Sequence, residues 1–281
     1  MNWVPLIFFD DVCHQLKREA FNQVSQLSGS WPSFGAEHRE KRREFDFRCR
    51  VSNQEVNYSL RETDRAHPPE VTVADLNLEF DRIIVLACDS GRPMPQRVSL
   101  RELERNILPT IAPLVANCSL HLFAWCSDQN LMVFKAFKNS SVFNAIMFDE
   151  QGEESRAFIA HQLEFGNVQK LTLYGTKNWP EEENLAETLK IFVSSARFHA
   201  LYSIDPLPND SKLLELFLER ALANELKRGA YIATPTGNCD ENRLLALHPE
   251  CRHNSQEWRI PDSNLRIALS HDVGMLCLNV E

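Results

Sequence analysis

The chain has 281 residues, which is enough for one large domain or two smaller ones with a hydrophobic core. Its 43% hydrophobic and 25% charged residues are typical of a folded protein and exclude a disordered one. The 30 Lys and Arg against 39 Asp and Glu leave a formal net charge of −9, so we expect no nucleic-acid and no membrane partner and favour a protein partner.

Residues 1–43 are predicted to form a compact helical module. Apolar side chains recur there at intervals of three and four residues, the period of a helix with one buried face. They are Phe8, Val12, Leu16, Phe21, Val24 and Leu27. The end of this segment, residues 37–44, alternates acidic and basic residues without an apolar stripe, so we expect a solvated helix end.

A strand and a polar connection follow the helices. Residues 45–51 alternate apolar and polar side chains with the period of a half-buried strand. Residues 52–79 are polar and contain Pro68-Pro69, which favours a linker or long loop. We therefore expect a domain boundary between residues 40 and 55, with domains at 1–45 and 46–281.

From Phe80 on, short apolar strands are predicted to alternate with amphipathic helices. The strand candidates are residues 82–87, 121–125, 143–148, 171–174, 201–204 and 265–269. Helical periodicity marks residues 100–115, 158–163, 185–196 and 213–221. A capping box of Ser99 and Glu102 opens the first of these helices, and Pro109 and Pro113 are expected to kink it.

This alternation predicts an α/β fold in which right-handed crossovers join parallel strands. The clearest unit runs from Leu171 through a helix to Leu201, and it resembles an irregular leucine-rich repeat. Thr176 stands where that family has an asparagine, and the units differ in length and sequence. We expect a small N-terminal three-helix module followed by a degenerate leucine-rich-repeat-like region, with an unrelated α/β domain as the alternative.

The apolar runs and cysteines bear on the compartment. The longest clean apolar run, residues 83–88, is far shorter than the roughly 20 residues that span a bilayer. The apolar N-terminal segment has no basic region before it and is followed at once by Asp10-Asp11, unlike a signal peptide. The 8 cysteines form no CxxC pair and are expected to be buried thiols. We expect a cytoplasmic and/or nuclear protein.

The sequence offers one candidate region for a metal. Thiolate and imidazole are the ligands that zinc prefers. The candidate ligands are Cys239, His248, Cys251, His253, His271 and Cys277. They lack the close pairs of a structural zinc site, and no HExxH motif is present, so we expect no metal and no cofactor.

Catalytic motifs are not apparent in the sequence. A GxSxG nucleophile turn is missing, and Cys88, Cys118 and Cys126 lie in apolar segments typical of buried thiols. The composition neither excludes nor supports a catalytic Cys–His pair. The acidic groups Asp10-Asp11 and 181–183 lie next to predicted helices, where a structural role is favoured. We expect no enzyme, and a hydrolase or transferase on an unrecognised α/β domain remains an alternative.

The N-terminal segment carries the most specific pattern. It opens with Val4-Pro5 and closes with Leu27-Ser28-Gly29-Ser30-Trp31. With its apolar ladder, it resembles the F-box, a three-helix motif that begins Leu-Pro and ends in a short hydrophobic-Ser-x-x-Trp element. Val4 replaces the leucine, and Gly29-Ser30 replaces the usual basic pair. The pattern is also similar to a large nematode family of divergent F-box-like proteins.

The F-box resemblance implies a function. The chain would be a non-catalytic substrate receptor of a cullin-RING ubiquitin ligase, binding a Skp-family adaptor through its N-terminal helices and a protein target through the αβ region. The adaptor-binding residues would be Val4, Pro5, Phe8, Phe9, Val12, Leu16, Leu27 and Trp31. Pro5, Phe8 and Phe9 would touch the adaptor. The alternative is an interaction protein whose N-terminal helices only cap the αβ region.

Overall fold

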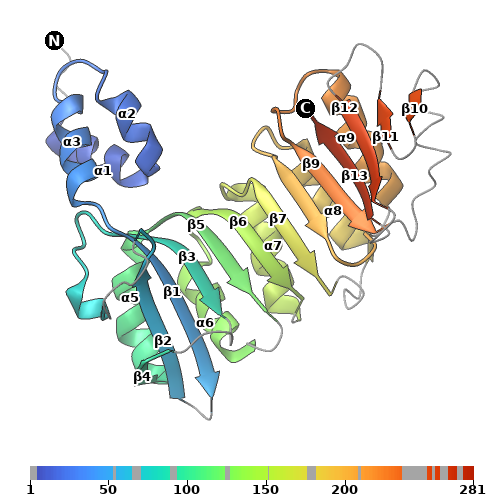
Figure 1. The fold of residues 1–281 in the computed structure, drawn as a ribbon. Helices are drawn as coiled ribbons and strands as arrows, with labels where there is room; N and C mark the ends of the chain where they lie inside the picture. The colour runs from blue at the N-terminus through green and yellow to red at the C-terminus, as the bar shows by residue number, and fades with distance from the viewer. Residues whose placement is uncertain are drawn as a thin grey trace. The chain divides into compact units, whose positions relative to one another are not determined.

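The structure is a computed structural model, drawn in Figure 1. It describes residues 5–52, 55–64, 71–88, 94–123, 127–150, 152–175, 182–207, 210–235, 252–254, 257–259, 265–270 and 275–281. The chain divides into two compact units, Met1–Phe143 and Asn144–Glu281. The expected boundary between residues 40 and 55 falls inside the first unit, to which the helical module belongs.

The helical module consists of short helices around a small core. Its elements are α1 (Leu6–Gln15), the 3-10 turn η1 (Arg18–Ala20), α2 (Phe21–Val24) and α3 (Trp31–Lys41). Cys13, Phe21 and Val24 form the buried centre, with Leu16, Trp31 and Phe34 packed against it. Gly35 lets α3 approach α2 closely, because a Cβ there would lie 2.7 Å from Cγ1 of Val24.

The sheet of the first unit contains a hairpin in the segment expected to be a linker. Its strands are β1 (Glu44–Ser52), β2 (Glu55–Glu62), β3 (Arg82–Cys88), β4 (Gln96–Ser99) and β5 (Val115–Leu122), in the spatial order β5-β3-β1-β2-β4. β1, β3 and β5 run parallel, whereas β2 is antiparallel to β1 and β4. The linker prediction is wrong for β2, because alternate side chains Val56, Tyr58 and Leu60 are buried.

Helices cover one face of this sheet (Figure 1). They are α4 (Leu100–Glu102), the π-helical turn η3 (Leu103–Ile107), α5 (Leu108–Ile111), the 3-10 turn η4 (Ala112–Leu114) and α6 (Ser127–Phe137), which was not predicted. Ser99 Oγ accepts the Glu102 N–H at 3.1 Å, as the capping box requires. The π turn widens the helix just before Pro109, whose ring would clash with the preceding turn of a regular helix.

The second unit confirms the alternation of strands and helices. Its elements are β6 (Phe143–Asp149), α7 (Glu153–Phe165), β7 (Lys170–Tyr174), α8 (Glu182–Ser194), β8 (Ala200–Ser203), α9 (Asp210–Leu222) and β9 (Tyr231–Pro235). β6 to β9 pair in sequence order and run parallel. An antiparallel part follows, with β13 (Met275–Val280), β12 (Leu265–Ser270), β11 (Glu257–Arg259) and β10 (Arg252–Asn254) in that spatial order.

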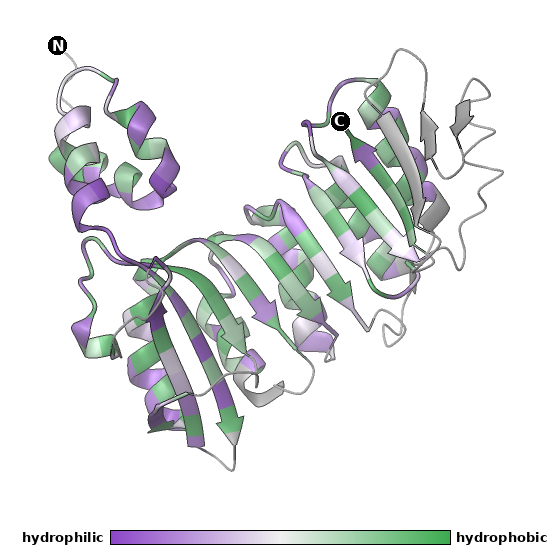
Figure 2. Ribbon diagram, viewed as in Figure 1, coloured by the Kyte–Doolittle hydropathy of each residue, from purple (hydrophilic) through white to green (hydrophobic). Residues whose placement is uncertain are grey.

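Strand side chains in the second unit sort into two faces. Helices α7, α8 and α9 lie on one face of β6 to β9 (Figure 1), and hydrophobic and hydrophilic bands alternate along the strands (Figure 2). The helix-facing side chains are buried: Ile146, Phe148, Leu171, Leu173, Leu201, Ile232, Leu276 and Leu278. The opposite face is partly exposed. The α/β class predicted from the sequence is therefore confirmed.

Candidate interaction surface on the N-terminal helices

The helical module exposes large apolar side chains. Leu6 is 65% exposed, Ile7 69% and Phe8 48%, and these three are consecutive in the first turn of α1. Leu27, beyond the end of α2, is 50% exposed. Pro5, directly before α1, is also exposed. Exposed apolar side chains in such number on a small module are typical of a protein-binding surface. We call Leu6, Ile7, Phe8 and Leu27 the apolar surface.

The residues predicted to bind an adaptor lie in different places. Val4 lies outside the described residues. Pro5, Phe8 and Leu27 are exposed, whereas Val12, Leu16 and Trp31 are partly buried. Leu6 and Ile7 were not predicted, although they are the most exposed apolar side chains of the module.

Phe9 belongs to the internal packing of the module. It is only 8% exposed. Its ring centroid lies 4.6 Å from that of Trp31, edge to face, and 5.5 Å from that of Phe34, stacked. Phe8 contacts the other side of this cluster, 6.1 Å from Trp31. The inward stripe of α1 is therefore Phe9 and Cys13, one residue away from the stripe of Phe8 and Val12 that was predicted.

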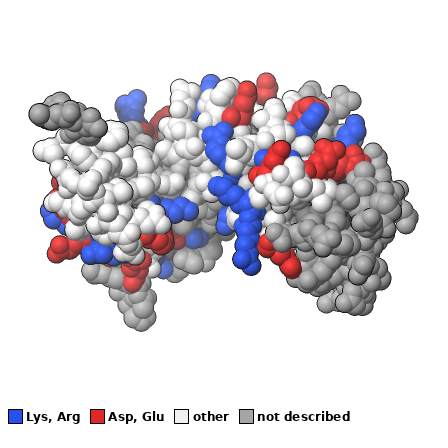
Figure 3. All heavy atoms as spheres, turned by 90° about the horizontal axis from the view of Figure 1, so that it is seen from above, with Lys and Arg blue, Asp and Glu red and all other residues white. Residues whose placement is uncertain are grey.

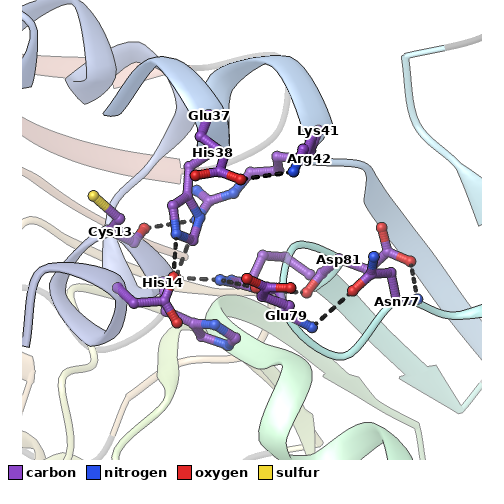
Figure 4. Close-up of polar contacts among 11 residues, drawn as sticks. Cys13, His14, Glu37, His38, Lys41, Arg42, Asn77, Glu79 and Asp81 are labelled. Carbon is purple, nitrogen blue, oxygen red and sulfur yellow. Dashed lines mark hydrogen bonds and ion pairs between the residues drawn. The ribbon is translucent and has the colours of Figure 1, made fainter. Parts of the chain in front are cut away.

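Two arginines join the module to the sheet at the carboxyl end of α1. Arg42 (Figure 4) follows α3 and donates to the carbonyl oxygens of Cys13 and Leu16, both at 2.6 Å. Arg82, the first residue of β3, donates from Nε to the carbonyl oxygen of His14 at 2.8 Å. The last carbonyls of a helix have no partner within the helix, so these contacts satisfy them and complement the helix dipole.

Both arginines of this junction are buried. Burial and the neighbouring charge of Arg42 lower the pKa of Arg82 to about 9, which leaves the guanidinium charged at neutral pH. Burial also lowers the pKa of Arg42. The two terminal nitrogens of Arg42 donate to carbonyl oxygens, whereas its Nε is buried without a hydrogen-bond partner. We call Arg42 and Arg82 the junction arginines.

Two histidines are packed into the same junction. His38 Nε2 lies 2.6 Å from a carboxylate oxygen of Asp10, and its ring contacts Phe80 at 5.2 Å. Burial lowers the pKa of His38, although Asp10 opposes that shift. Burial and the charge of Arg82 lower the pKa of His14 to about 4. His14 is therefore neutral at pH 7 and donates from Nε2 to the carbonyl oxygen of Pro113 at 3.1 Å.

A loop before β3 completes the junction. Arg43 donates to both carboxylate oxygens of Asp81, at 2.9 and 2.6 Å, and the Asn77 N–H donates to the same carboxylate at 2.7 Å. The Lys41 ammonium lies 4.7 Å from the centre of the Phe80 ring. The expectation of a solvated end over residues 37–44 is wrong in part, because His38 and Arg42 are buried against this loop and the sheet.

The structure places several of the cysteines and candidate metal ligands considered in the sequence. Cys13, Cys49, Cys88 and Cys118 are free, buried thiols. Burial raises the pKa of Cys13 and Cys118, which keeps both protonated at neutral pH. Of the candidate zinc ligands, Cys239, His248, Cys251 and His271 lie outside the described residues. Within the described ranges, no three His, Cys, Asp or Glu residues are grouped as metal ligands would be.

One groove of the second unit lies between α7 and α8. Its lining contains no Cys, Asp or His: Leu163, Glu164, Glu187, Lys190, Ile191, Ser194, Ser195 and Arg197. Among the helices that the structure describes, none is both long enough and apolar enough to cross a bilayer.

Comparisons with known proteins leave the family open. No family model and no curated protein matches the chain. Among solved structures, it is similar to the MycE methyltransferase of the mycinamycin biosynthetic pathway, determined with Mg and SAH, at a TM-score of 0.26 and 11% identity. That match covers 99% of this chain and 93% of the methyltransferase. A likeness at this level supports no conclusion on fold or function.

Proposed function

We propose that the chain is a non-catalytic substrate receptor of a cullin-RING ubiquitin ligase. Its N-terminal helices bind a Skp-family adaptor, and its αβ region binds a protein target. The observation that carries this proposal is the apolar surface, which lies on the segment that resembles the F-box. We place the protein in the cytoplasm and/or nucleus, since a reducing compartment suits its free buried thiols.

The apolar surface favours an external partner over an internal cap. If the module only capped the αβ region, its largest apolar side chains would be expected to face that region. Instead Leu6 and Ile7 remain about two thirds exposed while the opposite side of α1 holds Phe9 and Cys13. Apolar area of this kind supplies most of the binding energy in protein interfaces. Phe8 and Leu6 are therefore the proposed anchors.

The junction arginines support the same function. They hold the carboxyl end of α1 to β3 through charged hydrogen bonds from buried side chains. A helix fixed in this way presents its first turn in one orientation, which lowers the entropy lost when a partner binds.

The αβ region is proposed to be a degenerate leucine-rich-repeat-like array. Three successive strand–helix units, beginning at β6, β7 and β8, place their helices on one side of parallel strands. This is the arrangement that such repeats share. β13, which pairs antiparallel with β9, ends the parallel part, as a terminal cap would.

Co-purification with a Skp-family adaptor tests the proposal. The wild-type chain is expected to retain the adaptor, and Phe8→Ala or Leu6→Asp is expected to lose at least about tenfold in affinity. Phe165→Ala is the matched control, because Phe165 is a similarly exposed phenylalanine (61%) on α7. A wild-type chain that binds no adaptor, or a Phe8 variant that binds as tightly as wild type, would contradict the proposal.

A further inference from the structure

The second unit has a sheet face that α7, α8 and α9 leave uncovered (Figure 1). Strand register places Met147, Thr172, Tyr202, Ala233 and Cys277 in one row across β6, β7, β8, β9 and β13. The next row toward the amino ends of the parallel strands contains Ala145, Lys170, Ala200, Tyr231 and Asn279. We call Met147, Thr172, Tyr202, Tyr231 and Ile204, which follows β8, the open face.

The open face differs from the helix-facing side in its residue types. Tyr231 and Ile204 are exposed, and Met147, Thr172 and Tyr202 are partly exposed. Tyrosine offers a large rigid contact area together with a hydrogen-bonding hydroxyl, and methionine adapts its shape to a partner. Both residue types are enriched at the centre of protein interfaces.

Positive charge gathers at the amino ends of the same strands. Lys170 begins β7, Arg197 and His199 precede β8, and Lys227 and Arg228 precede β9. Figure 3, a view onto these strand ends, shows a band of Lys and Arg side chains. We call Lys170, Arg197, Lys227 and Arg228 the basic edge.

Backbone pairing holds these residues together. His199 accepts the Tyr231 N–H at 2.9 Å through its carbonyl oxygen, and Ala200 pairs with Lys170. Since neighbouring strands lie about 4.8 Å apart, the starts of β7 and β9 are within roughly 10 Å. Burial lowers the pKa of His199, and the charges of Lys170 and Lys227 lower it further. Both lysines therefore lie near His199.

The charges of the basic edge are available to a partner. Lys170, Lys227 and Arg228 are exposed, and none of them forms an ion pair with the residues that the structure describes. Arg197 makes two long hydrogen bonds, at 3.4 Å, to the Asn167 side chain and the Glu164 carbonyl oxygen. Glu281 follows β13, and Glu164 and Glu187 line the groove that Arg197 also lines. The local positive charge therefore comes from the exposed Lys170, Lys227 and Arg228, on a chain with a net charge of −9.

We infer that the open face and the basic edge together bind an acidic segment of a partner protein. Carboxylates of the segment pair with the basic edge, and its apolar side chains contact Tyr202, Tyr231 and Ile204. Four cations on an acidic chain are too few for the phosphate backbone of a nucleic acid. The identification of this segment as part of the ubiquitination target rests on the proposed function, whereas the binding surface itself does not.

Selection of short peptides from a random library on the immobilised full chain tests this inference. The enriched peptides are expected to be acidic, and their affinities are then measured by fluorescence anisotropy. Lys227→Glu combined with Arg228→Glu should weaken binding at least about tenfold at low salt, and less at high salt because exposed charges are screened. Tyr202→Ser should weaken binding at all salt concentrations.

The matched control reverses two exposed charges of the first unit. Lys135→Glu in α6 combined with Lys138→Glu, just after α6, changes the net charge equally and should retain the wild-type affinity. Selection without acidic enrichment, or equal affinities of the Lys227/Arg228 variant and this control, would overturn the inference. So would an oligonucleotide that binds the basic edge as tightly as the peptides.

The same variants separate this inference from the proposed function. Adaptor affinity of the Lys227/Arg228 variant should equal that of the wild-type chain, because the changes lie outside the first unit. A chain that binds acidic peptides but no adaptor would refute the ligase proposal and leave the docking surface standing. A chain that binds the adaptor but selects no acidic peptides would support the ligase proposal and refute the docking surface.

Discussion

The junction arginines of the first unit and the basic edge of the second carry the same charge in opposite surroundings. Arg42 and Arg82 are buried, and carbonyl oxygens accept their hydrogen bonds. Lys227 and Arg228 are exposed and precede a strand. Burial and hydrogen bonds to backbone carbonyl oxygens therefore distinguish a cation that holds the fold together from one that is available to a partner.

Substitution of Arg82 should have the largest effect on stability. Arg82→Met leaves the His14 carbonyl oxygen without its charged donor in a buried site, so the free energy of unfolding should fall by about 3 kcal/mol. Urea denaturation of the full chain measures this loss. Arg39→Met, on the exposed side of α3, should cost less than about 0.5 kcal/mol. Equal losses for the two variants would remove the distinction between buried and exposed cations.

Substitutions of Phe9 and Phe8 should distinguish a side chain of α1 that stabilises the fold from one that binds the adaptor. Phe9→Ala removes a buried ring from the cluster with Trp31 and Phe34, and the free energy of unfolding should fall by about 3 kcal/mol. Phe8→Ala should cost about 1 kcal/mol or less and act on adaptor affinity. Thermal melts and adaptor titrations on both variants give the two readouts. If the Phe8 variant melts as early as the Phe9 variant, Phe8 belongs to the core.

Stability should fall as the pH is lowered from 7 to 5. The pKa of His14 is about 4 in the folded chain and close to 6.5 in the unfolded chain, so the unfolded state binds more protons between these values. The loss due to His14 should be on the order of 2 kcal/mol at pH 5, and His38 contributes with the same sign. His14→Gln should flatten the dependence measured by urea denaturation at the two pH values. A dependence as steep as that of the wild type would assign it to other groups.

Gly35→Ala should show a smaller effect inside the module. The added methyl group would lie 2.7 Å from Cγ1 of Val24, so α3 has to move away from α2. Overpacking of this kind should cost about 1 to 2 kcal/mol, although alanine favours the helix. Ala36→Ser, one residue further along the exposed side of α3, is the control. A stabilised Gly35→Ala variant would show that the two helices are loosely packed.

The sequence predicted the elements whose apolar period was unambiguous. The strands predicted at residues 82–87, 143–148 and 171–174 were located within one residue at each end, whereas the helix predicted at 158–163 begins five residues earlier, at Glu153. β2 was missed because its many polar residues outweighed the alternation of Val56, Tyr58 and Leu60. The orientation of α1 was missed by one residue, since both the Phe8–Val12 and Phe9–Cys13 stripes are apolar and only tertiary packing chooses between them.

The candidate sites were less predictable than the fold. Arg42 and Arg82 are 40 residues apart, and their common role depends on the meeting of α1, α3 and β3. The basic edge likewise combines the start of β7 with residues from two separate connections, which strand register brings together. The charge pattern along the sequence does not show which distant residues the fold brings together. The exposed start of α1, in contrast, was indicated by Pro5 and Phe8.

Hydrogen exchange on the full chain with and without a Skp-family adaptor tests the role of the apolar surface. We expect slower amide exchange in the first turns of α1 and around Leu27, with the junction at Arg42 and Arg82 unchanged because it is already protected. Binding of the adaptor without added protection at residues 6–9, or with protection confined to the second unit, would contradict the role assigned to the apolar surface.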